Sequence, residues 1–385
     1  MNDTMDQTAD HPVEASVNAP VSVGEQASTA RCWVVSNGRP GTQNQALGLA
    51  RALQRILLPQ VTLSVQIKQI VVDRSLPAVL MGSLWSGAKN GGRTGALKRL
   101  SPKGHLLRPP FPDLWIAAGN DSVPVTMAVK QENPATFTIQ TQDPRVSPDA
   151  FDLVIPPHHD AIRGPNVLTM IGAPTPITKE KVAHARAAHD AWFVGVPERH
   201  VTVLLGGSTK RQWMSPAQTD TLIGQLRGLC GQGLGVLISG SRRTDARILT
   251  LLREAFAAQL KTGTVRLIDG AETTATGFNP YPAILANPMA ILVTEDSVNM
   301  VSEAAMTGHP VYMIALSGSA GKFRHFYRAM NARGITRPFT GTIEPWAYAP
   351  FDETGRVARS IAKTLEAKGV IDGVVPGGEN GVEDI

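Results

Sequence analysis

Short apolar runs alternate with helical patterns through the second half of the chain, and this rhythm limits the fold more than any other feature. The runs predict buried strands at Val201–Leu205, Gly235–Ser239, Val265–Ile268 and Ala290–Thr294. Glycines or polar residues end each run, and helical patterns separate the runs. Strands that alternate with helices in this way are typical of a parallel, doubly wound sheet. We therefore predict a Rossmann-like domain over residues 195–345.

Local signals place the helix starts of this half. Ser215-Pro216-Ala217-Gln218 combines a hydroxyl cap, a proline at the first helical position and a glutamine three residues after the cap. Thr244 is the expected cap of the next helix, which should run through Phe256. The segment "NPYPAILAN" predicts one further short helix.

The first half has a less regular pattern of the same kind. Strands are expected at Cys32–Ser36, Val61–Ile67, Asp113–Ala118, Thr136–Gln140 and Phe151–Ile155, with another candidate at Asn166–Ile171 and helices at Gln43–Arg55 and Lys179–Trp192. This predicts a second Rossmann-like domain over residues 31–194. The fold class is α/β, with two such domains facing each other across a cleft. Residues 346–371 should cross back and pack a C-terminal helix, Glu353–Ala367, on the first domain.

Charge and composition indicate which ligands and which cellular location suit the protein. The net charge is +5, yet residues 1–30 and 372–385 carry only acids among their charged residues, so the part between them is more basic and favours anionic ligands. Both acidic ends are predicted to be disordered. No apolar run reaches the ~18 residues that span a bilayer, and no signal peptide is expected. Two cysteines far apart in the sequence favour a reducing, cytoplasmic location.

Polar groups follow four predicted strand ends in the second half. In open α/β sheets, ligands bind beyond the carboxyl ends of strands, where helix N-termini present N–H groups to phosphate. We expect a nucleotide there, bound by Gly207, Ser208, Lys210, Arg242, Arg243, Asn279, Tyr281, Asp296, Ser297 and Glu303. The alternative is that these residues only cap helices and form solvated turns.

The opening of the last of these helices suggests separate roles for its polar residues. Ser297 and the N–H of Val298 would meet a diphosphate, and Glu303 would accept hydrogen bonds from a ribose diol. Glu295 and Asp296 would cap the helix or orient a cation.

In the first domain, the loop "NGRPG" joins the first strand to its helix. Gly38 and Gly41 flank Arg39-Pro40, and Asn44 lies on the first helical turn. The loop matches neither the dinucleotide fingerprint nor a Walker loop. It could hold an anion or let a substrate approach the backbone, and the alternative is a simple helix-capping turn.

Two further segments carry unusual side chains. Residues 86–108 contain six cations and no acid, which indicates either a solvated loop or a patch for anionic lipid headgroups. Nucleic acid is not expected, because no aromatic residues interleave the charges. In "PPHHD", His158 and His159 are adjacent and should point to opposite faces, so no metal site is expected there, and no cofactor elsewhere.

Several long blocks resemble one known family. They are "NGRPGTQNQALGLARAL", "LLGGSTK", "SRRT", "NPYPAILANPMAILVTEDSVNMVSEAAMTGHPVYM" and "GKFRHFYRAMNARGITRPF", in this order. They resemble the family of the plant mitochondrial fission factor named for elongated mitochondria, and its bacterial members in particular.

The resemblance implies a fold and several roles. It implies a glycosyltransferase-like architecture of the GT-B type. Asp296 to Pro310 is similar to the donor-binding segment of lipid-linked sugar transferases, so Glu303 takes the ribose role, and Ser297, Gly207 and Ser208 take phosphate roles. The plant member is described as an adaptor that recruits a dynamin-related GTPase to the mitochondrial surface.

Three functional hypotheses follow. The first is metal-independent transfer of a sugar from a nucleotide-sugar to an acceptor at the cytoplasmic face of a membrane, on which the protein would be peripheral. Lys210 and Arg242 or Arg243 would stabilise the leaving diphosphate, Arg39 would reach across the cleft, and Asp121 would be the general base. The second is a non-catalytic, membrane-associated adaptor, whose protein partner the sequence does not identify. The third is a nucleotide-sugar epimerase.

Overall fold

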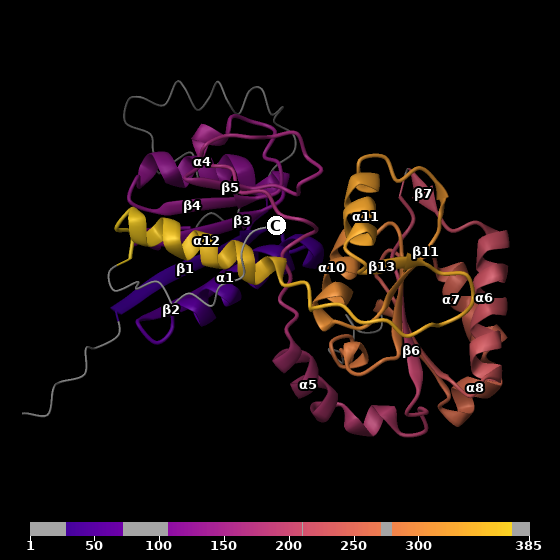
Figure 1. Cartoon of the computed structure of the whole chain (residues 1–385). Coiled ribbons are helices and arrows are strands. Elements are labelled where there is room, and N and C mark those ends of the chain that lie inside the picture. The colour runs from indigo at the N-terminus through magenta and orange to yellow at the C-terminus, as the bar shows by residue number, and fades with distance from the viewer. Residues whose placement is uncertain (1–27, 72–106, 210, 271–278, 372–385) are drawn as a thin grey trace, which may run out of the picture.

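The computed structural model describes residues 28–71, 107–209, 211–270 and 279–371, which fold around two parallel sheets (Figure 1). The first sheet has five strands in the order β2-β1-β3-β4-β5. Its strands are β1 (Ser28–Ser36), β2 (Val61–Gln69), β3 (Leu114–Ala118), β4 (Phe137–Thr141) and β5 (Leu153–Ile155). Every residue of β3, β4 and β5 is buried, as expected for parallel strands with both faces covered.

β1 begins inside the segment that we predicted to be disordered. Ser28, Thr29 and Ala30 extend the strand because they pair with residues 61–63 of β2. The rest of the predicted disordered ends, residues 1–27 and 372–385, lies outside the described residues. So does most of the basic segment 86–108, of which only Leu107 and Arg108 are described.

The helices of this half are α1 (Pro40–Leu57), α4 (Val123–Glu132) and α5 (Lys179–Ala188), with short 3-10 turns η2 (Asn120–Ser122), η3 (Pro148–Ala150) and η4 (Asp190–Phe193). Pro40 starts α1, where its missing N–H costs nothing. Leu49, Leu53 and Leu57 then follow at helical spacing and are buried against the sheet.

The second sheet has six parallel strands in the order β13-β11-β10-β6-β8-β9. The strands are β6 (His200–Leu205), β8 (Gly235–Gly240), β9 (Val265–Ile268), β10 (Ala290–Thr294), β11 (Val311–Ile314) and β13 (Thr336–Pro338). The four strands predicted from the sequence are all present. A small antiparallel pair, β7 (Gln212–Trp213) and β12 (Ser317–Gly318), lies outside this sheet.

Helices cover both faces of the second sheet. They are α6 (Pro216–Gly231), α7 (Ala246–Ala255), α8 (Ala257–Thr262), α10 (Val298–Thr307) and α11 (Phe323–Ala332), together with the 3-10 turn η5 (Ala283–Leu285). The predicted capping box of α6 is confirmed, since Ser215 and Gln218 exchange both hydrogen bonds.

Two local predictions are wrong, and a third is confirmed with a shorter helix than expected. The cap of α7 is Asp245, whose side chain accepts from the Arg247 N–H, while Thr244 donates to the carbonyls of Leu205 and Gly206. Asn166–Ile171 forms isolated bridges with residues 154 and 157 instead of a strand. The short helix predicted in "NPYPAILAN" is present as the single 3-10 turn η5.

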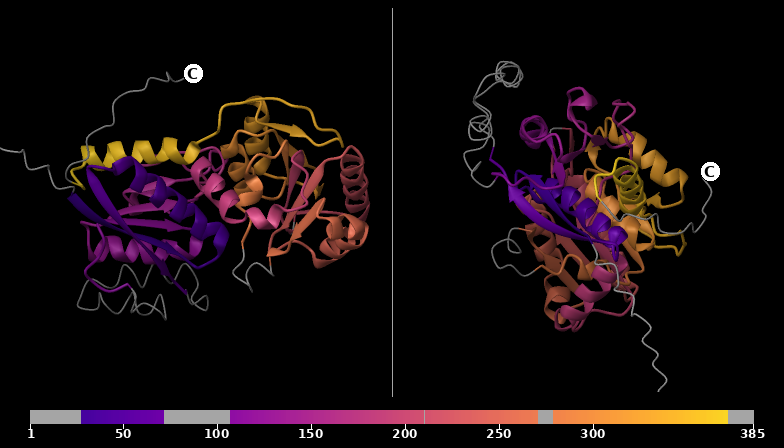
Figure 2. Two further views of the ribbon diagram at one scale, coloured as in Figure 1. Left: turned by 90° about the horizontal axis from the view of Figure 1, so that it is seen from below. Right: turned by 90° about the vertical axis from the view of Figure 1, so that its left-hand side faces the viewer.

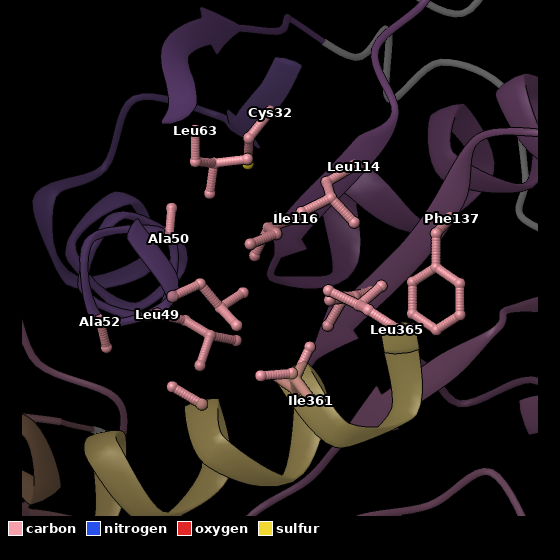
Figure 3. Close-up of a cluster of buried hydrophobic side chains, with 14 of the residues drawn as sticks. Cys32, Leu49, Ala50, Ala52, Leu63, Leu114, Ile116, Phe137, Ile361 and Leu365 are labelled. Carbon is pink, nitrogen blue, oxygen red and sulfur yellow. The ribbon is translucent and has the colours of Figure 1, made fainter. Parts of the chain in front are cut away.

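The last helix, α12 (Glu353–Ala367), crosses back and lies along the first domain (Figure 2). Ile361 and Leu365 of α12 join Leu49 of α1 and Ile116 of β3 in one buried cluster (Figure 3). Two Rossmann-like sheets with the final helix returned to the first domain form the predicted GT-B arrangement. Within the described ranges, no helix is both long and apolar enough to cross a bilayer.

Candidate functional site

The first turns of α1 and α10 meet where the two domains face each other (Figure 1). Asn299 on α10 donates to the carbonyl of Gly41 at 3.2 Å and accepts from the Gln45 side chain at 2.9 Å. Gln45 in turn accepts from Gln142, which follows β4, at 2.9 Å. These amides join the carboxyl-end loops of both sheets, the edge at which open α/β sheets bind ligands.

Beside this contact lies a cavity of about 300 Å³, which we call the Glu303 cavity. It brings together most of the residues predicted to form the site. Those that line it are Gly41, Asn44, Arg242, Arg243, Asn279, Tyr281, Ser297 and Glu303. Since two of them come from the first domain and six from the second, the cavity depends on how the domains meet.

Glu303 is the most unusual group in this cavity, because it is only 8% exposed. Tyr281 donates a short hydrogen bond to its carboxylate. Burial raises the pKa of Glu303 to about 7, against the lowering effects of the Tyr281 hydrogen bond and of the positive charge of Lys181. Burial, together with the charge of Glu303, also raises the pKa of Tyr281 well above its usual value. The carboxyl is therefore balanced between its two protonation states near neutral pH.

Ser297 caps α10, since its side chain accepts from the N–H of Met300. The prediction that Glu295 or Asp296 caps this helix is therefore wrong. The carboxylate of Asp296 points back to the sheet, where it accepts from the N–H of Gly207 and from the hydroxyl of Thr294, both at 2.7 Å. Asp296 thus ties the loop after β10 to the loop after β6.

The glycines of the loop after β6 permit this close approach. A Cβ on Gly206 would lie 2.2 Å from the carboxylate oxygens of Asp296, and one on Gly207 would lie 2.3 Å from the backbone oxygen of Arg243. Gly207 and Ser208 line a separate, smaller cavity beside Asp296. The predicted site residue Lys210 lies outside the described residues.

The remaining predicted residues surround the loop before α1. Asp121 accepts from the side-chain amide of Asn37 at 2.7 Å, and Asn37 accepts from the N–H of Arg39. Gly38 has a φ of 75°, a conformation that glycine adopts without strain. Neither Arg39 nor Asp121 is among the described residues that line the Glu303 cavity or the adjoining cavity described next.

A second cavity, of about 310 Å³, adjoins the first, and we call it the His159 cavity. The two cavities share Arg243, Ser297 and Asn299. From the first domain it is lined by Gln45, Asn120, Gln142, Asp143, Arg145, His159 and Asp160, and from the second by residues that include Asp296, Lys322 and Phe323.

His159 is not among the site residues that the sequence predicts, where its only candidate role is that of a metal ligand. As expected, the neighbouring histidines diverge: His158 is exposed, whereas the His159 side chain is only 4% exposed. No group of three metal-binding side chains gathers anywhere in the described part of the chain. The strand-end rule that identified the other loops applies equally to the loop after β5, so the sequence did contain a signal for His159.

Comparisons with known proteins agree with the family resemblance. A family model described as mitochondrial fission ELM1 matches residues 40–365. The chain is 29% identical to mitochondrial fission protein ELM1 of Arabidopsis thaliana over 413 residues, covering 90% of this chain and 93% of the relative.

Solved structures of similar architecture include two enzymes. One is UDP-GlcNAc 2-epimerase of Methanocaldococcus jannaschii, in complex with UDP-GlcNAc and UDP, at a TM-score of 0.47 and 11% identity over 87% of this chain and 99% of that chain. The other is ADP-heptose LPS heptosyltransferase II of E. coli, at a TM-score of 0.42 and 15% identity over 88% and 99% of the two chains.

Proposed function

The chain belongs to the mitochondrial fission ELM1 family, and from that premise we propose that it binds a nucleotide-sugar in the Glu303 cavity and transfers the sugar to an acceptor. The observation that carries the proposal is the buried carboxyl of Glu303 in a cavity that also holds two arginines and the N-terminus of α10.

The chemistry of this cavity matches that of a nucleoside diphosphate. A carboxylate accepts hydrogen bonds from both hydroxyls of a ribose, which would satisfy the buried Glu303. Arg242, Arg243 and the N-terminus of α10 supply positive charge for the diphosphate. Each cavity lies near the lower end of the roughly 300–1,000 Å³ that small-molecule sites occupy, and the two together offer separate places for donor and acceptor.

The transfer step follows from this placement. The bond between the sugar and the diphosphate breaks, and the negative charge on the leaving diphosphate grows. Arg242, Arg243 and the helix dipole would stabilise that charge, the role that a metal ion plays in other transferases. We propose that no cofactor other than the donor takes part.

A non-catalytic adaptor is the second candidate, because the Arabidopsis relative is named for mitochondrial fission and not for a transfer reaction. In that case a nucleotide would regulate binding to a protein partner. Peripheral association with an anionic, cytoplasmic membrane face is part of both proposals and rests on the cations of residues 86–108.

Thermal unfolding with nucleotides tests the proposal. We expect uridine, guanosine, adenosine or cytidine diphosphate, or one of their sugars, to raise the Tm, since a ligand at one hundred times its Kd stabilises the folded state by about 2.7 kcal/mol. Glu303→Gln should abolish the shift, and Glu254→Gln, at an exposed position on α7, should retain it. No shift with any of these ligands, or an equal shift in Glu303→Gln, would contradict the proposed site.

A further inference from the structure

The His159 cavity lies where the sugar of a bound donor would point. With its ribose at Glu303 and its diphosphate at Ser297, a donor would lie against the residues that line both cavities. Its sugar would then face the His159 cavity, in which both domains supply side chains. In this arrangement an attacking acceptor would bind in the second cavity.

His159 is a cavity-lining side chain that makes no hydrogen bond to another described residue. Its side chain is 4% exposed, and it lines the cavity. The nearest carboxylate oxygen, on Asp160, is 3.9 Å from Nε2, which is too long for a hydrogen bond. No other described residue hydrogen-bonds either ring nitrogen. Because these nitrogens have no hydrogen-bond partner among the described residues and their side chain lines the cavity, they are free to hydrogen-bond a ligand bound there.

Residues of both domains fix the position of this imidazole. Its ring meets the ring of Phe323, at the start of α11, edge to face with centroids 5.3 Å apart. Asp160, beside it in sequence, forms a 2.5 Å ion pair with Lys322 of the second domain. His159 is therefore held in place only when the two domains are together.

We infer that His159 accepts the proton of the attacking acceptor hydroxyl, an inference that rests on the proposed transfer reaction. The hydroxyl oxygen forms the new bond to the sugar carbon as the bond from that carbon to the diphosphate breaks. The bonding electron pair leaves with the diphosphate, and the hydroxyl proton moves to the free ring nitrogen of His159. Solvent then takes the proton from the imidazolium.

The ionisation of His159 suits this role. Burial lowers the pKa of His159 below its usual value of 6.5, and the carboxylate of Asp160 opposes that effect. The charge of Lys322 lowers the pKa further, and so do the neighbouring side chains of His325 and His158. Asp143, Arg145, Arg243 and Asp296 are the other charged groups that line the cavity. The imidazole is therefore neutral at neutral pH and able to accept a proton.

The base predicted from the sequence, Asp121, is less well placed. Its carboxylate accepts from Asn37, and among the described residues it is the neighbouring Asn120 that lines the cavity. The cavity wall also indicates the class of acceptor. Apolar Ile155, Met170 and Phe323 alternate with amides and charged groups, which fits an alcohol with both polar and apolar faces, such as a sugar ring.

Release of nucleoside diphosphate from nucleotide-sugars tests the inference on the full chain. Each donor is supplied with water or glycerol as the attacking hydroxyl. We expect His159→Asn to lower turnover by roughly 100- to 10,000-fold, with an unchanged Kd for the diphosphate. His158→Asn, at the exposed neighbour, should keep the turnover of the wild type at neutral pH.

The pH profile separates a proton acceptor from a merely structural residue. In the wild type, turnover should fall at acid pH as His159 becomes protonated, and the residual turnover of His159→Asn should lack that fall. Asp160→Asn should move the fall to lower pH, because Asp160 raises the pKa of His159.

Each remaining outcome is decisive. Wild-type turnover in His159→Asn would overturn the role of His159 and leave the proposed function standing. Binding of donor without turnover in the wild type would overturn both the transfer reaction and the proton transfer. Absence of binding by every donor would overturn the proposed function itself.

Discussion

At the scale of single residues, Glu303 and Tyr281 give the site its chemistry. Burial of a carboxyl that is only 8% exposed destabilises its anion by more than the hydrogen bond from the Tyr281 phenol stabilises it, so Glu303 holds its proton to an unusually high pH. A ribose that replaces or supplements the Tyr281 hydrogen bond would favour the ionised carboxylate. The proposed ligand would therefore offset the free-energy cost of burying this carboxylate.

The stability of the free protein should reveal this pKa. Burial raises the pKa of Glu303 from 4.5 to about 7, so the folded chain binds a proton that the unfolded chain has released between these values. The free energy of unfolding should thus fall as pH rises through this window. Relative to Glu303→Gln, the wild type should lose roughly 3 kcal/mol between about pH 4.5 and pH 8.

Denaturant unfolding of both proteins across this pH range measures the difference, with Glu254→Gln as the control for an exposed carboxylate. A constant difference between wild type and Glu303→Gln at all pH values would show that Glu303 has an ordinary pKa.

The sequence could predict that Glu303, Arg242 and Ser297 lie close together, because each follows the end of a strand that its apolar pattern identifies. It could not predict that Asp296 accepts a hydrogen bond from the N–H of Gly207, since Gly207 lies 89 residues away in the chain. The burial of His159 depends on Phe323 and Lys322 of the other domain, which no local pattern contains.

At the scale of elements, α1 is held on two sides. Its apolar face packs on the first sheet and against α12, as Figure 3 shows for Leu49, Ile116 and Ile361. Gly48 allows a further close approach, because a Cβ there would lie 2.4 Å from the carbonyl carbon of Thr175. The helix that carries Gly41 and Asn44 into the Glu303 cavity is thereby fixed relative to the chain that leads to α5.

Two glycine substitutions in helices should have opposite effects. Gly48→Ala on α1 should lower the free energy of unfolding, since the added Cβ meets backbone that cannot move aside. Gly224→Ala on α6 should raise it by roughly 0.5–1 kcal/mol, because nothing lies within 4 Å of that Cβ and alanine favours the helix. Urea unfolding of both variants provides the measurement. A stabilised Gly48→Ala protein would contradict the packing of α1 described above.

The sequence predicted the strands of the second half and the start of α6 correctly because both depend on nearby residues. Its prediction of helix caps failed where either of two adjacent residues could cap the helix. Thr244 and Asp245 are both good caps, and only the tertiary bond of Thr244 to the loop after β6 leaves Asp245 to cap α7. The same applies to Asp296 and Ser297 before α10.

At the scale of the whole molecule, both cavities are formed by the two domains together. Gln45 and Asn299 join α1 to α10, and Lys322 joins α11 to the loop after β5. The last helix, α12, follows the second domain in the chain and packs on the first domain, so it also joins the two domains (Figure 2). Binding of a donor and closure of the domains should therefore be coupled, which would exclude water from the reacting sugar.

A crystal structure with the nucleoside diphosphate that gives the largest thermal shift tests the central claim most directly. The account predicts the ribose hydroxyls within hydrogen-bond distance of the Glu303 carboxylate, and the diphosphate between Ser297 and the side chains of Arg242 and Arg243. A nucleotide bound elsewhere on the protein, with the Glu303 cavity unoccupied and the Tyr281 hydrogen bond unchanged, would contradict it.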